Sequence, residues 1–167
     1  MLYELQPYEL HIKILLLIII ANGAPIIARN IFRSHFDDPL DLGMHFFDKR
    51  PIFGPSKTMR GIFMAVMITP VAAHMMEINW FTGFLIGLYA MFGDLFASFI
   101  KRRKGYESSE MAFGLDQIPE SLFPLLALKV HFEFSLIEIL AMVAVFIIVE
   151  LILSRILFYM HVRLRPY

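Results

Sequence analysis

Long apolar segments dominate this chain and decide what it can fold into. Residues 14–20 are an unbroken run of isoleucine and leucine, and residues 136–160 form the clearest apolar stretch. A helix needs about 20 mostly apolar residues to cross a bilayer. The 167 residues are 58% hydrophobic, with a mean hydropathy of +0.65, whereas soluble domains are roughly 45–50% apolar. We therefore predict an all-α integral membrane protein, with one membrane-embedded domain over residues 1–167.

Five segments are interpreted as membrane spans. The fourth is the weakest, because Glu120 and Lys129 interrupt it. Such a chain is expected to be a multi-pass protein of the cytoplasmic membrane of the cell. The predicted spans are residues 9–30, 61–78, 80–100, 117–132 and 136–160.

The basic residues predict the orientation of these spans. Of the 15 lysines and arginines, all but Lys13 and Lys129 lie between spans one and two, between spans three and four, or in the C-terminal part that ends with Arg165. Short loops rich in lysine and arginine stay on the cytoplasmic side of a membrane. The N-terminus is therefore predicted outside and, after five spans, the C-terminus in the cytoplasm.

The third span ends in a charged stripe. Asp94, Ser98, Lys101 and Arg102 follow the spacing i, i+4, i+7, i+8, so they share one helix face. An acid inside a span is costly and indicates a functional site. A carboxylate with a hydroxyl can ligate Mg²⁺, and the two cations can hold phosphate oxygens. The alternative is that the basic run 101–104 only anchors the span.

A second candidate lies just before the second span. Residues 53–61 lack the spacing of a G-x-x-x-x-G-K-[ST] phosphate loop and the strand that precedes one, so we reject that motif. Lys57, Thr58 and Arg60 nevertheless lie beside a predicted helix N-terminus, where phosphate binds readily. The alternative interpretation is a turn followed by a helix N-cap.

Two further polar positions fall on the same predicted side. Asp116 lies just before the fourth span, and together with Asp94 it could hold one or two divalent ions for phosphoryl chemistry. Capping of the fourth helix is the alternative for Asp116. Asn22 precedes Pro25 inside the first span, where it either links helices or lines a site. Glu150, in the fifth span, has no clear partner, since Arg155 is poorly spaced for one helix face.

Other chemistries find little support in the sequence. The chain has no cysteine, which excludes disulfides, thiolate metal sites and a cysteine nucleophile. Its six histidines are scattered, and none has the H-x-H or H-x-x-x-H spacing of paired ligands. A histidine metal site is therefore not expected.

Taken together, these motifs resemble a known enzyme superfamily. Residues 54–61 (GPSKTMRG) resemble the K-T-x-x-G element of the CTP-dependent phosphatidate cytidylyltransferases, and residues 93–105 (GDLFASFIKRRKG) resemble their signature block. Residues 115–117 (LDQ) are similar to the closing motif of a smaller branch, the CDP-archaeol synthases. Residues 22–25 (NGAP) and 39–43 (PLDLG) also resemble that branch, so the similarity covers nearly the whole chain.

The resemblance implies transfer of CMP from CTP to an archaetidic-acid-like diether lipid phosphate, with release of pyrophosphate. The implied partners are CTP, the lipid phosphate and the bilayer, with no nucleic acid. The resemblance is also compatible with a homodimer. The active site would lie on the cytoplasmic side with Mg²⁺ as cofactor. The implied metal ligands are Asp94 and Asp116, which act in catalysis with Lys101. The implied substrate contacts are Lys57, Thr58, Arg60, Ser98, Arg102, Arg103, Asn22, Asp41 and Gln117.

Three other functions are also compatible with the sequence. The first is CDP-diacylglycerol synthesis from phosphatidic acid, which uses the same chemistry. The second is a small transporter with Asp94 as an ion site, and the third is a non-catalytic membrane scaffold. A CDP-alcohol phosphotransferase is excluded, because its D-G-x-x-A-R motif is missing from the sequence.

Overall fold

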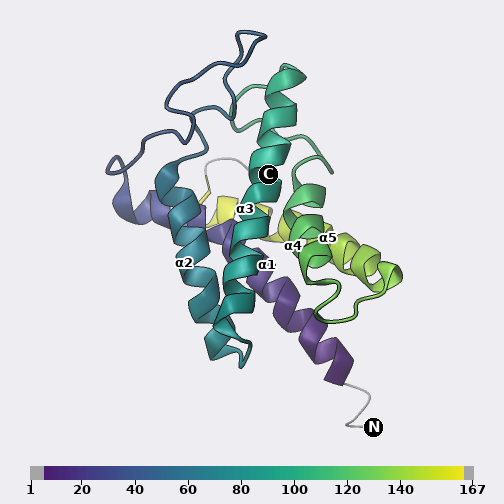
Figure 1. The fold of residues 1–167 in the computed structure, drawn as a ribbon. Coiled ribbons are helices and arrows are strands. Elements are labelled where there is room, and N and C mark those ends of the chain that lie inside the picture. The colour runs from purple at the N-terminus through teal and green to yellow at the C-terminus, as the bar shows by residue number, and fades with distance from the viewer. Residues whose placement is uncertain (1–5, 164–167) are drawn as a thin grey trace.

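The computed structural model describes residues 6–163 and contains five α-helices in that range (Figure 1). Only two isolated β-bridges, and no strand, occur within the described residues. Arg165, which entered the orientation argument, lies outside them. The helices are α1 (Gln6–Phe32), α2 (Met59–Met75), α3 (Trp80–Arg103), α4 (Gln117–Leu128) and α5 (Leu136–Tyr159).

Side-chain caps fix where three of the helices begin. The Thr58 hydroxyl accepts a hydrogen bond from the backbone N–H of Gly61 at the start of α2, and Asn79 caps α3 in a similar way. Ser135 and Glu138 form a reciprocal capping box at the start of α5. These caps satisfy amide groups that have no partner inside the helix.

The predicted fourth span is corrected by the structure. α4 ends at Leu128, and turns follow from Lys129 onward. Its 12 residues extend about 18 Å at 1.5 Å each, which is less than the roughly 30 Å of a hydrocarbon core. α1, α3 and α5 are long and apolar enough to cross a membrane, and α2 is a shorter apolar helix. The chain is an all-helical integral membrane protein whose α4 is too short to span alone.

Helix α3 is the centre of the bundle, with α2 on one side and α4 on the other (Figure 1). α1 packs against α2 and α3, and α5 packs against α4. A Cβ on Gly83 of α3 would lie 2.5 Å from the Cβ of Ala73 in α2, so only glycine permits this close approach. The core contains Ile14, Leu17, Ile18, Ile86, Leu125, Leu128 and Phe146.

Many large apolar side chains on the outer faces are exposed, among them Phe63 and Val71 of α2 and Leu140 and Ile148 of α5. A soluble monomer rarely exposes so much apolar surface, whereas lipid chains cover such faces without cost. The exposed apolar faces therefore agree with a membrane environment.

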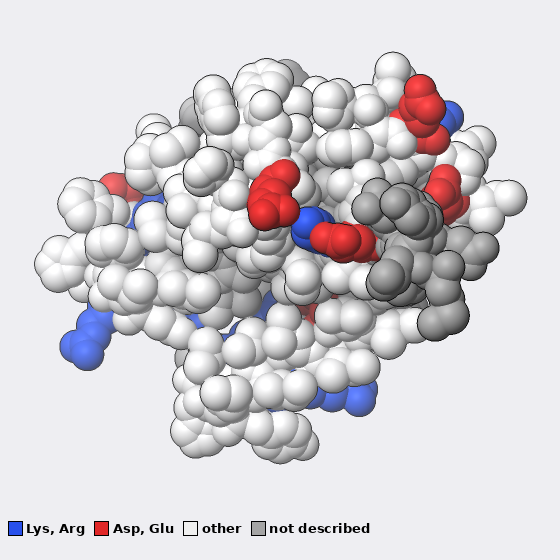
Figure 2. Space-filling model, turned by 90° about the horizontal axis from the view of Figure 1, so that it is seen from below, with Lys and Arg blue, Asp and Glu red and all other residues white. Residues whose placement is uncertain are grey.

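The two ends of the bundle differ in charge. Figure 2 looks onto the end where α1 begins; most of its surface is uncharged, and acidic side chains stand in small groups. Lys13, near the start of α1, is paired with Glu9 at 2.7 Å. The opposite end carries the two long loops, residues 33–58 and 104–116, and most of the basic residues lie in these loops or in the helix turns that adjoin them.

Candidate active site

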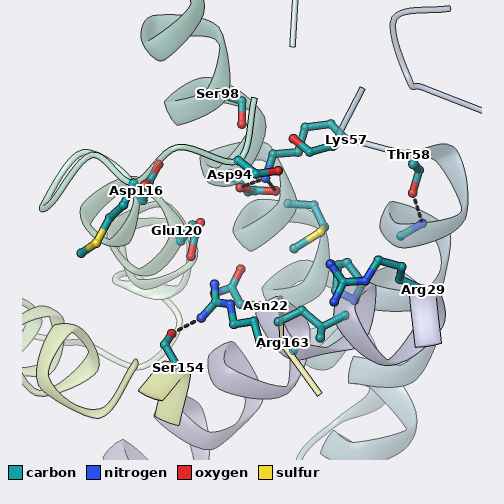
Figure 3. Close-up of a pocket in the computed structure, with 18 of the residues that line it drawn as sticks. Asn22, Arg29, Lys57, Thr58, Asp94, Ser98, Asp116, Glu120, Ser154 and Arg163 are labelled. Atoms are coloured by element: carbon teal, nitrogen blue, oxygen red, sulfur yellow. Dashed lines mark hydrogen bonds and ion pairs between the residues drawn. The ribbon is translucent and has the colours of Figure 1, made fainter. Parts of the chain in front are cut away.

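A cavity of about 520 Å³ lies among the five helices and the two long loops (Figure 3). Every helix contributes to its wall, from Asn22 in α1 to Glu150 in α5. The structure thus brings together most of the residues that the sequence singled out. Those lining the cavity are Asn22, Lys57, Thr58, Arg60, Asp94, Ser98, Lys101, Arg102, Asp116 and Gln117.

An ion pair joins the loop before α2 to the middle of the site. The Lys57 ammonium donates to both carboxylate oxygens of Asp94, at 2.5 and 2.7 Å. Burial lowers the pKa of Lys57, but the carboxylates of Asp94, Glu120 and Asp116 together outweigh burial and hold that pKa above its ordinary value. Lys57 is therefore fully charged at neutral pH, as a phosphate-binding group must be.

A second ion pair joins α3 to the start of α4. Lys101 donates to the two carboxylate oxygens of Asp116 at 2.8 and 3.1 Å, and only 8% of the lysine side chain is exposed. Asp116 also accepts a hydrogen bond from the backbone N–H of Ala112. Asp116 occupies the N-cap position of α4 but makes no side-chain cap bond. The capping interpretation of Asp116 is therefore wrong.

Four buried donor or hydroxyl groups at the cavity have no hydrogen-bond partner among residues 6–163. They are Nδ2 of Asn22, Nε of Arg60, Nε of Arg102 and Oγ of Ser108. Arg102 is fixed by a 2.8 Å hydrogen bond from Nη2 to the carbonyl oxygen of Glu107. Buried polar groups are normally satisfied, so these groups suit a polar ligand in the cavity.

Arg60 and Thr58 have structural partners as well as a place on the cavity wall. Arg60 donates to the carbonyl oxygen of Arg33 at 2.9 Å and pairs with Asp37, which ties the end of α1 to the start of α2. The Thr58 hydroxyl caps α2. The N-cap alternative is thus confirmed for Thr58, and both side chains shape the loop that carries Lys57.

The structure does not bring Asp41 to the cavity, because this carboxylate is used to fold its own loop. Asp41 accepts hydrogen bonds from the backbone N–H groups of Phe53 and Gly54, each at 2.9 Å, and from that of Gly43 at 3.1 Å. Burial raises the pKa of Asp41, but these hydrogen bonds outweigh burial and hold the pKa below its ordinary value. Asp41 orders the segment that leads to Lys57.

Arg103 also lies outside the cavity wall. Its guanidinium pairs with Asp48 at 2.8 Å and lies 4.9 Å from the ring centroids of both Phe46 and Phe99. On a helix, Arg103 points away from the face that Asp94 and Ser98 share. Its partners show that it fastens the first long loop to the end of α3.

Two acids at the cavity were not assigned a function from the sequence. Glu120, which was treated only as an interruption of an apolar segment, points into the cavity beside Asp94 (Figure 3). Glu150 pairs with Arg163 at 3.1 Å rather than with the exposed Arg155, and accepts a hydrogen bond from Gln117 at 3.3 Å. The rule that an intramembrane acid marks a site, which identified Asp94, also applies to Glu120.

The oxygen donors at the cavity suit a hard divalent cation. Asp94, Asp116, Glu120 and Ser98 supply carboxylate and hydroxyl oxygens, which Mg²⁺ prefers. Within residues 6–163, no three histidine, cysteine or acidic side chains are close enough together to enclose a metal. Mg²⁺ usually takes one or two carboxylates and shares the remaining positions with water and substrate phosphates, so this donor set fits a metal that arrives with a nucleotide.

Comparison with known proteins identifies a family. Residues 8–165 match the model of the CarS-like CDP-archaeol synthases. The CDP-archaeol synthase of Pyrobaculum calidifontis is 33% identical over 129 residues, which cover 74% of this chain and 76% of the relative. That of Sulfurisphaera tokodaii is 28% identical over 155 residues, with 89% and 90% covered.

A solved structure agrees with this result. It is described as an intramembrane enzyme for archaeal membrane lipids biosynthesis, with a TM-score of 0.74 and 25% sequence identity; the match covers 86% of this chain and 91% of the other. The family model spans almost all of the helices and loops that build the cavity. The chain therefore belongs to the CarS-like family of CDP-archaeol synthases.

Proposed function

We propose that this chain transfers CMP from CTP to an archaetidic-acid-like diether lipid phosphate, giving CDP-archaeol and pyrophosphate. The observation that carries the proposal is the pair of lysine–carboxylate contacts, Lys57 with Asp94 and Lys101 with Asp116, in one cavity. Family membership and the names of its relatives support the same activity. All the residues involved come from a single chain, so the proposal needs no second copy.

The reaction is an in-line displacement at the α-phosphorus of CTP. An oxygen of the lipid phosphate forms the new P–O bond, while the bond to the β-phosphate breaks and pyrophosphate leaves with the electron pair. Lys57, Lys101 and Arg102 bind the triphosphate and neutralise the charge that develops on the leaving pyrophosphate. Ser98, buried beside them, positions a phosphate oxygen by hydrogen bonding.

Asp94 and Asp116 are the proposed ligands of Mg²⁺, with Glu120 beside them. When bound, the ion would polarise the phosphate oxygens and align the reacting groups. The protein's own contribution is mostly positioning, since the chain would hold both substrates at fixed places in one cavity.

The cavity is proposed to open to the cytoplasm, with the N-terminus outside. The two long loops that border the cavity, together with the helix turns that adjoin them, carry most of the basic residues, as the positive-inside rule requires of the cytoplasmic side. CTP would enter from that side, whereas the lipid would reach the cavity from the bilayer, its chains leaving sideways between helices.

The test is an assay of purified protein in detergent with labelled CTP, Mg²⁺ and either a diether or a diester glycerol phosphate. We expect labelled CDP-lipid and an equal amount of pyrophosphate, with the diether preferred. A preference for the diester would favour CDP-diacylglycerol synthesis. If neither lipid yields product while the protein also fails to bind CTP, a transporter or scaffold would replace this proposal.

A further inference from the structure

Six cationic side chains line the cavity, of which Arg29 and Arg60 donate to the carbonyl oxygens of Val162 and Arg33. The other four fall into two sets on different walls. Lys57, Lys101 and Arg102 belong to the wall formed by α3 and the two long loops. Arg163, which follows α5, lies across the cavity from Asp94 and next to Asn22 (Figure 3). The proposed reaction has two phosphate-bearing substrates, and the nucleotide accounts for only the first set.

Arg163 is held in place from several directions. Its Nη1 donates to Glu150 at 3.1 Å and to the Ser154 hydroxyl. The preceding residue, Val162, accepts hydrogen bonds through its carbonyl oxygen from Arg29 at 3.3 Å and from Asn30 at 3.0 Å. The end of the described chain is thus fastened to α1, and Arg163 is fixed on the cavity wall.

The Arg163 guanidinium has N–H groups that remain available to a ligand. Both side-chain hydrogen bonds of Arg163 use Nη1, and within residues 6–163 neither Nε nor Nη2 makes another. Nearby, the buried Nδ2 of Asn22 also has no partner in the described part of the chain. Arginine presents its N–H groups as a planar fork that matches phosphate oxygens, so these two side chains together form a site for one phosphate group.

The surroundings of Arg163 indicate which phosphate binds there. The same part of the cavity is lined by apolar side chains of α5 and α1, namely Phe146, Leu153, Leu157 and Ile19. The outer face of α5 also exposes Ile148 and Ile152 to the bilayer. A phosphate beside such a wall suits a lipid headgroup whose chains pass into the membrane, whereas a nucleotide would leave this apolar surface unmatched.

We propose that Arg163, with Asn22, binds the phosphate of the lipid substrate and sets it opposite the nucleotide held by Lys57, Lys101 and Arg102. This inference rests on the proposed cytidylyltransferase function and adds the lipid subsite to it. Glu150 and Ser154 act as positioning residues, because they hold Nη1 while the free side of the guanidinium faces the phosphate.

The experiment measures the KM of each substrate for the purified protein with CTP, Mg²⁺ and the diether glycerol phosphate. For Arg163→Ala we expect the KM of the lipid to rise about 10- to 100-fold, as for loss of a charged hydrogen bond, with the KM of CTP changed less than about twofold. Arg163→Lys should recover part of the affinity, since it keeps the charge but loses the fork. Arg155→Ala, which removes a charge from the exposed face of α5, is the matched control and should behave like the wild type.

Two further measurements distinguish loss of the lipid subsite from misfolding of the variant and from loss of a site for free phosphate. Calorimetric binding of CTP with Mg²⁺ to Arg163→Ala should match the wild type, which shows that the variant is folded. Inhibition by added pyrophosphate should also be unchanged if the subsite holds the lipid rather than a free phosphate. An unchanged lipid KM, or a change confined to CTP or pyrophosphate, would overturn the lipid subsite; inactivity of the wild type would instead refute the proposed function.

Discussion

Gly93 of α3 and Pro119 of α4 are in backbone contact: a Cβ on Gly93 would lie only 2.2 Å from the carbonyl oxygen of Pro119. The next residue on each helix is an acid of the cavity, Asp94 on α3 and Glu120 on α4. The closest approach of the two helices therefore sets the position of two carboxylates at once.

Gly93→Ala should push α3 and α4 apart, because backbone atoms cannot yield as the end of a flexible side chain can. We expect a lower midpoint of thermal unfolding, and turnover reduced at least about tenfold, because a shift near 1 Å at a catalytic group has effects of this size or larger. Gly23→Ala is the matched control for stability, since a Cβ there meets nothing within 4 Å. Equal unfolding midpoints for the two variants would contradict the close contact.

Asp94→Asn should abolish CDP-lipid formation while leaving membrane insertion intact. The substitution keeps the side-chain shape but removes the negative charge that Lys57 contacts and the proposed metal ligand. We expect a loss of at least about 100-fold in turnover, measured with labelled CTP in isolated membranes. Asp48→Asn, outside the cavity wall, is the control; near-normal turnover by the Asp94 variant would refute its assigned role.

Lys101→Ala and Lys104→Ala distinguish catalysis from anchoring. Both lysines belong to the basic run, but Lys101 is buried against Asp116 whereas Lys104 is exposed. We expect turnover to fall sharply only for the Lys101 variant, because its removal also leaves the Asp116 carboxylate without its cation. If both variants lost activity equally and showed altered topology by protease accessibility, the basic run would be an anchor.

The stability of the first long loop should depend on pH through Asp41. The folded pKa of this carboxyl lies below its ordinary value of 3.8, so its ionised form stabilises the fold above that value. The contribution is lost as the pH falls below about 4 and the carboxylate is protonated. Thermal unfolding of the wild type between pH 6 and pH 3 should show this loss, roughly as a one-proton dependence.

Asp41→Asn should be destabilised at pH 6 and should show a smaller decline toward pH 3, because the group that titrates is gone. Asp48→Asn serves as the comparison. Asp48 lies in the same loop, but its carboxylate does not accept hydrogen bonds from three backbone N–H groups as that of Asp41 does. A wild-type pH dependence that persists unchanged in Asp41→Asn would exclude Asp41 as its source.

The helices could be predicted from the sequence because lipid imposes a simple rule on apolar length. α1, α3 and α5 begin and end within three residues of the predicted spans. The rule fails for α4: it cannot tell an apolar segment that crosses the bilayer from one that packs against α3 and α5 and stops at Leu128. The outcome there depends on tertiary packing rather than on local hydropathy.

The clustering of candidate residues was predictable where they share one helix face, as for Asp94, Ser98, Lys101 and Arg102. Periodicity says nothing about long loops, however, and Asp41 is an acid whose partners are backbone amides 12 and 13 residues away. Arg163 was counted only as a topological charge, because its contact with Glu150 requires the chain to turn back after α5. Such contacts follow from three-dimensional folding and leave no periodic signal.

The two lysine–carboxylate pairs carry a consequence for the order of binding. Before any substrate enters, Lys57 and Asp94 neutralise each other, and Lys101 and Asp116 do the same. A nucleotide that bound the lysines alone would leave the two carboxylates unpaired. A metal that bound the carboxylates alone would leave the two ammonium groups unpaired. Either result is costly in a partly buried site. Metal and nucleotide should therefore bind with positive thermodynamic coupling. When they bind together, the lysines contact the phosphates and the carboxylates contact the metal, so no charge is left unpaired.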